Sequence, residues 1–283
     1  MKKLLKTIAL VLTCSLMLSG CWDQGVFEQV GFILSLGVEQ TEDKNLLITS
    51  AYPVIGGAEK GAVDVISTET SIVRGGRTNL RRMTPKMLEG GKIQQVLISD
   101  SLAKNGIHDL LEVFQRDITL PAIAFVVIVE GSPAELLKKA LEFKTKPRVS
   151  IYLYQLLENN VKLSNIPNTK IFDFDINFFA PGLDPIVPMV KIDNEQIKIT
   201  GCALFSGDKM TGNLENKETN VLLGLMDQLK YTDYIFTDSV FADKDGDKQG
   251  VAVSLFKPKR KINIDFNEEG KPIFEINLSG MIQ

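Results

Sequence analysis

The chain has 283 residues, of which 44% are hydrophobic, so it is long enough for two domains of ordinary size around a sizeable core. Its 32 basic and 35 acidic residues give a formal net charge of −3, and this balance argues against nucleic acid as a partner. Beyond the first 20 residues, the longest apolar stretch is 122–129, which has the length of a buried strand rather than of a membrane span.

The first 20 residues have the layout of an export signal. Lys2, Lys3 and Lys6 form a basic start, an apolar run covers 7–18, and small residues follow. The apolar run is about half of the ~20 residues that a spanning helix needs, so an export signal is favoured over a transmembrane anchor. Without this segment, 29 basic residues stand against 35 acidic ones, and the net charge becomes −6.

The tetrapeptide LSGC at 18–21 resembles a bacterial lipobox. The resemblance implies that the Cys21 sulfur receives a diacylglycerol and that cleavage follows Gly20, which leaves Cys21 as the first residue. Two or more acyl chains, at about 0.8 kcal/mol per buried methylene, would hold the protein on the outer face of a bacterial membrane. Trp22 would then lie at the headgroup level, where indole rings prefer to lie. A plain export signal with a chance cysteine is the alternative.

The chain has three cysteines, and each has a separate explanation. Cys14 lies in the expected signal, the lipobox resemblance implies a lipid on Cys21, and Cys202 is expected to be a small core residue in an apolar strand. A disulfide framework or a thiolate metal site therefore does not fit one mature chain, and we expect no metal and no cofactor.

The first half of the chain mixes strands and helices. Apolar runs bounded by turn residues predict strands at 27–38 and 45–54, which form a hairpin with its turn at 41–44. Two further strands are predicted at 93–99 and 122–130. The Gly-rich residues 56–70 read as a mobile segment. Helical spacing predicts helices in part of 71–91, at 107–117, at 134–143 after a Ser132-Pro133 cap, and at 150–161.

The tract 164–188 holds four prolines and predicts a linker-like crossing toward a second domain. After it come a hairpin that turns at 206–208, a helix from 216 or 217, and three strands in meander order, at 250–258, 261–267 and 272–282. The pattern predicts an α+β protein of two domains. We place the N-terminal domain at 21–196 and the C-terminal domain at 197–283.

Arginines cluster in the stretch RGGRTNLRR. Helical spacing places Arg74, Arg77 and Arg81 on one helix face. Such a face could meet lipid phosphate or an acidic partner surface. A solvated helix face explains the same pattern, and both interpretations stay open.

Candidate catalytic and metal-binding residues are sparse. The single histidine, His108, is expected to be exposed or to cap a helix, beside Asp109. Asp173 and Asp175 would share one face if they lay on a strand, but no other reactive residue accompanies them, so we expect both at the surface. The acidic stretch 243–250 lacks the glycine and glutamate spacing of an EF-hand loop and predicts a charged turn.

Three separated stretches carry a resemblance to a known family. The first, SGCWDQGVFEQVGFILSLGVE at 19–39, holds Cys-Trp-Asp and then Glu28 before a glycine-containing strand. The second is QQVLISDSLAKNGIHDLLEVFQRD at 94–117, and the third is TGCALFSGDKMTGNLENKET at 200–219. In this order they resemble the Ger(x)C family, the lipoprotein C subunits of spore germinant receptors. One departure is Gly25, where the family more often has a charged residue.

The resemblance implies a role without catalysis. Members of the family are lipoproteins of the spore membrane that assemble with two integral-membrane subunits, A and B, to sense small nutrients and trigger germination. The resemblance does not say whether this subunit binds the small molecule itself. Members usually continue beyond the position that corresponds to Gln283, so we expect the second domain to be truncated, either naturally or as a fragment.

Two other classes of protein could share the predicted anchor. A solute-binding lipoprotein of a transporter would be built from alternating βαβ units in two lobes, and the meander predicted at 250–282 argues against it. An exported hydrolase would need a nucleophile motif near His108, Asp173 or Asp175, and the sequence offers none.

Overall fold

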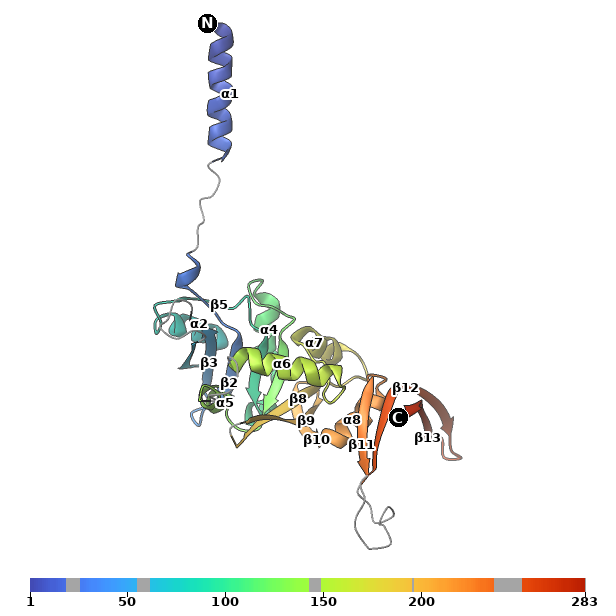
Figure 1. The fold of residues 1–283 in the computed structure, drawn as a ribbon. Coiled ribbons are helices and arrows are strands. Elements are labelled where there is room, and N and C mark those ends of the chain that lie inside the picture. Colours follow the sequence, from blue (N-terminus) through green and yellow to red (C-terminus); the bar gives the residue numbers. More distant parts are fainter. Residues whose placement is uncertain (19–25, 55–61, 143–148, 195, 237–250, 283) are drawn as a thin grey trace.

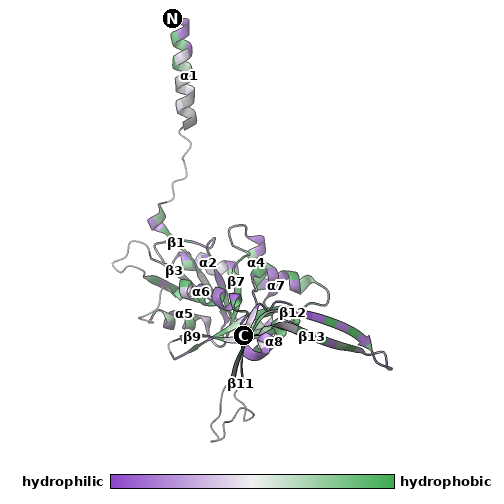
Figure 2. Ribbon diagram, turned by 45° about the vertical axis from the view of Figure 1, so that its right-hand side comes forward, coloured by the Kyte–Doolittle hydropathy of each residue, from purple (hydrophilic) through white to green (hydrophobic). Residues whose placement is uncertain are grey.

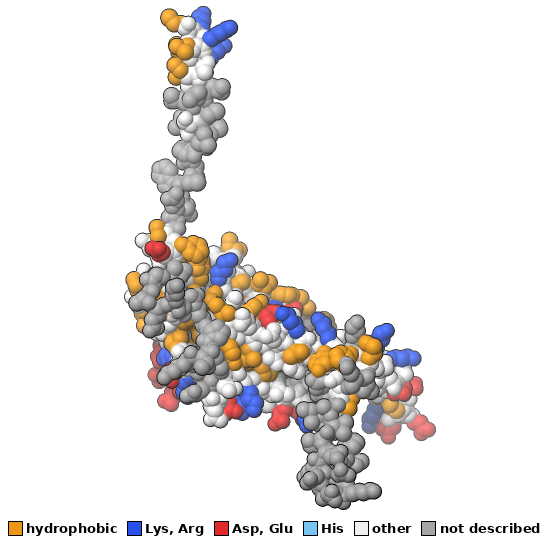
Figure 3. All heavy atoms as spheres, in the orientation of Figure 1, with side chains coloured by type: hydrophobic (Ala, Val, Ile, Leu, Met, Phe, Trp, Pro, Cys, Tyr) orange, Lys and Arg blue, Asp and Glu red, His pale blue; other side chains and the backbone are white. Residues whose placement is uncertain are grey.

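The computed structural model describes residues 1–18, 26–54, 62–142, 149–194, 196–236 and 251–282. The first helix, α1 (Lys2–Leu18), stands apart from the folded body (Figure 1). In the space-filling view, basic side chains gather at its free end, while acidic and basic side chains are interspersed over the visible face of the body (Figure 3).

The body is built on one eight-stranded sheet with the order β10-β9-β8-β7-β6-β2-β3-β4. Four adjacent strands at its centre are parallel, and they are β2 (Ser35–Gln40), β6 (Gln95–Ser99), β7 (Phe125–Val129) and β8 (Ile186–Asp193). Antiparallel strands flank them on both sides, and they are β3 (Leu46–Pro53), β4 (Val63–Thr70), β9 (Gln196–Ser206) and β10 (Lys209–Glu215).

The central strand β7 is buried on both faces, which explains its continuous apolar sequence. Val126 and Ile128 belong to one hydrophobic core, whereas Phe125, Val127 and Val129 belong to the other. The first core is covered by α2 (Val73–Arg81), α3 (Asp100–Asn105), α4 (His108–Arg116) and α7 (Ile171–Phe179). The second is covered by α5 (Pro133–Ala140) and α6 (Val149–Lys162). Figure 2 shows hydrophobic strands between these helices.

Two polar interactions fix the helices of the second face. At the start of α5, the Ser132 Oγ accepts a hydrogen bond from the Glu135 backbone N at 3.1 Å, with Pro133 in the first helical turn, so the predicted cap is confirmed. On α6, the buried Ser150 Oγ accepts from the Ser35 Oγ at 2.8 Å. Gln95 on β6 donates to both Ser35 and the Ser150 carbonyl, which ties α6 to the centre of the sheet.

The hairpin predicted at 197–214 is confirmed as β9 and β10, and α8 (Asn216–Leu225) follows it. The domain boundary expected from the sequence, between residues 196 and 197, falls at the start of β9. Because β9 also pairs with β8, one sheet contains strands from both sides of that boundary. Gly201 stands beside a register shift in this pairing, with φ +133. A Cβ atom there would collide with the Leu214 carbonyl oxygen of β10, so this position requires glycine.

A smaller sheet has the order β11-β12-β13. Its strands are β11 (Tyr231–Phe236), β12 (Val251–Phe266) and β13 (Pro272–Ile282). The two strands predicted at 250–258 and 261–267 are therefore one long strand, interrupted only by a register shift between Phe256 and Lys259. Pro258 lies at that shift and has no N–H to donate, so a single strand bends there instead of ending.

Three further predictions about the elements were wrong. The strand at 27–38 is divided into η1 (Phe27–Gln29), β1 (Val30–Phe32) and β2, and β1 pairs with β5 (Met87–Glu89). The predicted hairpin with its turn at 41–44 is confirmed, because β2 pairs antiparallel with β3. Within 56–70, residues 63–70 form β4 because β3 supplies an antiparallel partner along its whole length. The tract 164–188 contains α7, which begins well after Pro167 and ends before Pro181, so its prolines bound a helix. The predicted α+β class is confirmed by the mixture of helices and strands in the described residues.

We expect Gly201→Ala to lower the free energy of unfolding by about 2 to 4 kcal/mol, because alanine strains the backbone and meets Leu214. Gly212→Ala on the same hairpin is the matched control, since among the described residues no atom beyond Gly212 and its two neighbours lies within 4 Å of its Cβ position. That control should change stability by less than about 0.5 kcal/mol. Equal losses in a denaturant titration of the two variants would contradict the requirement for glycine.

A second prediction concerns Tyr52 on β3, whose hydroxyl donates to Asp64 at 2.5 Å and lies 2.9 Å from the Thr84 hydroxyl. Burial, with the hydrogen bond to Asp64, raises the pKa of Tyr52 to about 12. The folded state therefore holds this proton more tightly, so the contribution to stability is complete below pH 10 and is lost as the pH rises toward 12.

Tyr52→Phe should cost about 1 to 2 kcal/mol at pH 7, because it removes a buried hydroxyl with two partners. The stability difference between the two proteins should shrink as the pH rises above 10, in urea titrations at several pH values. Asp64→Asn should bring the Tyr52 pKa back toward 10, which absorbance of tyrosinate would detect. A difference that is constant with pH would contradict the assignment.

Candidate functional site

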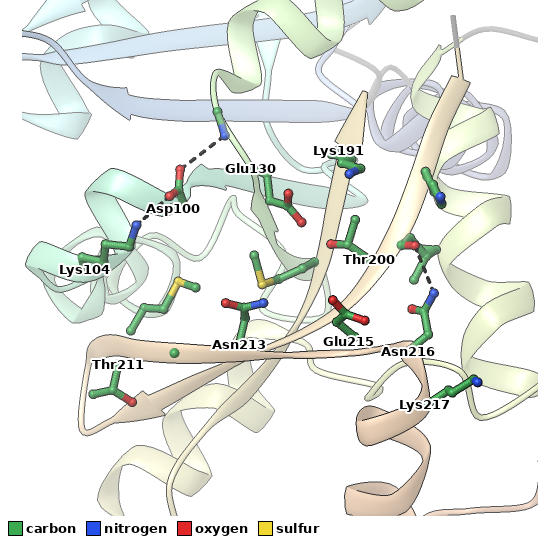
Figure 4. Close-up of a pocket in the computed structure, with 16 residues that line it drawn as sticks. Asp100, Lys104, Glu130, Lys191, Thr200, Thr211, Asn213, Glu215, Asn216 and Lys217 are labelled. Atoms are coloured by element: carbon green, nitrogen blue, oxygen red, sulfur yellow. Dashed lines mark hydrogen bonds and ion pairs between the residues drawn. The ribbon is translucent and has the colours of Figure 1, made fainter. Parts of the chain in front are cut away.

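A polar cleft of about 910 Å³ lies at the carboxyl ends of β6 and β7 and extends across β8, β9 and β10 (Figure 4). In Figure 4, Glu130, Thr200, Asn213 and Glu215 surround its centre. Side chains of both signs line it, namely Asp100, Glu130, Glu215, Lys104, Lys191, Lys198 and Lys217.

The parallel strands explain why the first wall is polar. Asp100 follows β6 directly as the first residue of α3, and Glu130 follows β7. Because β6 and β7 are adjacent and parallel, their carboxyl ends meet at one edge of the sheet, where open α/β sheets commonly bind ligands. The Glu130 backbone N donates to the Val190 carbonyl at 2.9 Å, which places Glu130 beside Lys191 of β8.

Asp100 is held in place from two sides. Its carboxylate accepts a hydrogen bond from Lys104 at 2.8 Å and from the Gly131 backbone N at 3.3 Å. Burial raises the pKa of the Asp100 carboxyl, but the hydrogen bonds from Lys104 and Gly131 outweigh it and hold the pKa below its ordinary value. Asp100 therefore joins α3 to Gly131, the second residue after β7, and fixes this side of the cleft.

The opposite wall comes from the β9–β10 hairpin and the start of α8. Asn216 donates to the Ile199 carbonyl at 3.5 Å, which holds the start of α8 against β9. The Thr200 Oγ1 is buried and has no hydrogen-bond partner among the described residues. With exposed carboxylates, ammonium groups and amides close together, the cleft can bind a polar segment that carries both charges. Among the described residues, no group of three or more His, Cys, Asp or Glu could hold a metal ion.

The sequence analysis did not single out the cleft residues. A usable signal was present, because an acidic residue directly follows each of two apolar strands, as Asp100 and Glu130 do. Using that signal requires knowing that the two strands are parallel neighbours, which the sequence pattern does not establish.

Two of the three clustered arginines are engaged within the chain. Arg77 lies 3.2 Å from Asp117 and 3.5 Å from Glu89, and Arg81 lies 3.2 Å from Glu89. The Arg74 side chain is exposed. The helix expected in 71–91 thus directs Arg77 and Arg81 toward shared acidic partners, and their contact with lipid or with a partner protein stays a prediction.

His108 is not exposed and does not cap α4, so that expectation was wrong. Its side chain is 20% exposed and its ring stacks on Phe178, with centroids 4.5 Å apart, and meets Phe179 edge-on at 5.5 Å. The aromatic residues come from α7, which the sequence analysis did not predict. His108 lies 3.9 Å from Asp109, and its Nε2 is buried without a partner among the described residues.

Asp173 and Asp175 lie on a helix, α7, so they do not share a face as they would on a strand. Asp173 accepts from the Lys170 backbone N at 3.0 Å and caps the helix. Asp175 lies near His108, and burial raises the pKa of its carboxyl despite the hydrogen bond from Gln115 and the charge of His108. The structure thus brings His108 near Asp175 and places Asp173 in a separate, structural role.

The remaining predicted residues divide into two groups. Cys202 is fully buried in the core, as expected, and accepts a hydrogen bond from the Thr219 hydroxyl. Cys21, Trp22 and the acidic stretch 243–250 lie outside the described residues. The lipid anchor and the interfacial tryptophan therefore stay predictions.

Comparisons with known proteins cover both parts of the chain. Residues 23–192 match the family described as the spore germination protein N-terminal domain, and residues 200–282 match the family described as spore germination B3/GerAC like, C-terminal. Spore germination protein GerQC of Bacillus cereus is 23% identical over 235 residues, which cover 82% of this chain but only 64% of the relative. Spore germination protein A3 of Bacillus subtilis (strain 168) is 22% identical, over 91% of this chain and 71% of the relative.

A solved structure shares the fold. The crystal structure of the GerBC protein matches with a TM-score of 0.51 at 18% identity, over 91% of this chain and 74% of that chain. The two family matches together run from residue 23 to residue 282, in the order that the three sequence motifs predicted. The chain therefore belongs to the Ger(x)C family of spore germination proteins.

Proposed function

We propose that this chain is a lipid-anchored, non-enzymatic subunit of a nutrient germinant receptor in the spore membrane. The observation that carries the proposal is the ordered match of both germination-protein families along residues 23–192 and 200–282. Relatives with this architecture are named spore germination proteins. The chain would act through assembly with two integral-membrane subunits, A and B.

The N-terminal segment supports an anchored position. No helix in the described part of the chain combines the length and the apolar character that a membrane crossing needs. The α1 helix carries three lysines at its start, as an export signal does, and Cys21 follows it in the sequence. Acyl chains on Cys21 would hold the folded body at the membrane surface and raise its effective concentration near membrane partners.

The polar cleft supports a docking role for the body. It is open to solvent at the sheet edge, and its charges are not of one sign, so it suits a polar loop with matching charges better than a single ion. The proposed mechanism is that an extracytoplasmic loop of a membrane subunit occupies the cleft and that this contact biases the conformation of the receptor.

The proposal is tested by crosslinking this protein in spore membranes, recovering it, and identifying the attached proteins by mass spectrometry. We expect two polytopic membrane proteins in fixed proportion. Glu130→Lys should reduce their recovery severalfold, because it reverses a charge in the cleft. Glu142→Lys, at an exposed position outside the cleft, is the matched control and should leave recovery unchanged.

Three outcomes would contradict parts of the proposal. Recovery of the protein alone would contradict its assembly with two membrane subunits. Recovery with permease and ATPase subunits would favour a solute-binding lipoprotein of a transporter. Equal recovery with Glu130→Lys and Glu142→Lys would leave the receptor role in place and exclude the cleft as the docking site.

The anchor has a separate test. Cys21→Ala should leave the protein unprocessed and without acyl chains, because the thiol that receives the lipid is missing. Cys14→Ala, in the same N-terminal segment, is the matched control and should be processed and acylated normally. Intact-protein mass spectrometry with labelled fatty acid measures both. Acylated protein of mature size from Cys21→Ala would contradict the lipobox.

A further inference from the structure

A second, apolar cavity of about 60 Å³ lies under α2 and α4, on the opposite side of the parallel core from α5 and α6. Its walls are mainly aliphatic and aromatic side chains, among them Leu36, Ile48, Leu80 and Phe114. One water molecule needs about 10 to 15 Å³ of such space, so the cavity has room for roughly four to six waters. It therefore has room for a molecule of a few non-hydrogen atoms.

One polar group faces this cavity from the sheet. Ser50 of β3 lies between Ile48 and Tyr52 and is fully buried. Ser50 lines the cavity, and its Oγ has no hydrogen-bond partner among the described residues. A buried hydroxyl without a partner is unfavourable, and proteins normally satisfy such a group with a side chain, water or ligand. Ser50 thus offers a hydrogen-bonding position in an otherwise apolar wall, which a water or a ligand could use.

The rim of the cavity is polar and includes Arg74, Arg77 and Asp117. The ion pair between Arg77 and Asp117 joins α2 to the residue that follows α4. The α2 helix holds adjacent glycines at 75 and 76, in its first half. Gly76 is buried, and a Cβ atom there would collide with Ile48, so α2 packs closely on β3 beside the cavity.

We propose that this cavity is a binding site for a small, uncharged aliphatic molecule with a single hydrogen-bonding group, which pairs with the Ser50 hydroxyl. The apolar walls exclude a charged group at the floor, because its desolvation would be unfavourable. The apolar part of the ligand would therefore lie inside the cavity, away from the charged side chains at the rim. This site is separate from the polar cleft, and the inference does not depend on the receptor role.

The probe for this site is 1-butanol, titrated into the full chain with ¹³C-labelled isoleucine methyl groups. We expect saturable shifts at the methyl groups of Ile33 and Ile48, which line the cavity, and none at Ile197, which belongs to the other core. Xenon, which has no hydrogen-bonding group, should enter the same space. Absence of saturable shifts at Ile33 and Ile48 would overturn the proposal.

Two variants test separately the contribution of the Ser50 hydroxyl and that of the cavity space. Ser50→Ala should weaken 1-butanol binding about fivefold, the loss of one net hydrogen bond, while xenon binding is kept. Ser50→Leu should abolish binding of both probes by filling the space. The matched control is Ser67→Ala on β4, whose hydroxyl pairs with Thr49 outside the cavity and should not affect either probe.

Crystals of the unmodified chain soaked in 1-butanol give an independent readout. The expected result is density for the alcohol with its oxygen within hydrogen-bond distance of the Ser50 Oγ. An ordered water retained on Ser50 at saturating alcohol would overturn the proposal, and so would equal 1-butanol affinity in Ser50→Ala and the unmodified chain.

Discussion

Burial of the central parallel strands on both faces is the constraint from which the rest of the structure follows. A strand such as β7, in which every residue is buried, needs helices above and below the sheet, and parallel neighbours need long crossovers. The helices α3 and α4 between β6 and β7, and the helices between β7 and β8, meet both needs at once. The serines and glutamine that join α6 to β2 and β6 are tolerated in this interior because they hydrogen-bond to one another.

The two candidate sites are consequences of the same sheet. The polar cleft lies where adjacent parallel strands end together, so Asp100 and Glu130 meet there although 30 residues separate them in sequence. The apolar cavity lies where α2 crosses the antiparallel part of the sheet and the α2 and α4 side chains leave a space above Ser50. The cleft thus follows from strand direction, and its polar lining fits the polar loop proposed as its partner. The cavity follows from imperfect packing between helices, and its apolar lining fits the small aliphatic ligand proposed for it.

Local signals in the sequence were sufficient where a short motif determines the geometry. Ser132-Pro133 predicts the start of α5, and the turn at 206–208 predicts the β9–β10 hairpin, because capping and turn residues act over a few positions. Prediction was wrong where a distant partner decides, as with β4, which β3 completes, and with His108, which α7 covers. The cleft and the cavity could not be predicted, because both depend on which strands are neighbours and on which helix covers them.

The hairpin of β12 and β13 projects from the body (Figures 1 and 2), and its two faces differ in character. Ile264, Phe266 and Phe274 are 58%, 68% and 59% exposed and alternate with polar neighbours along the strands. Exposed apolar area of this kind makes the colloidal behaviour of the isolated protein depend on the solvent, because salts such as sulfate strengthen apolar association. Its apparent molecular mass in solution should therefore vary with salt type and concentration.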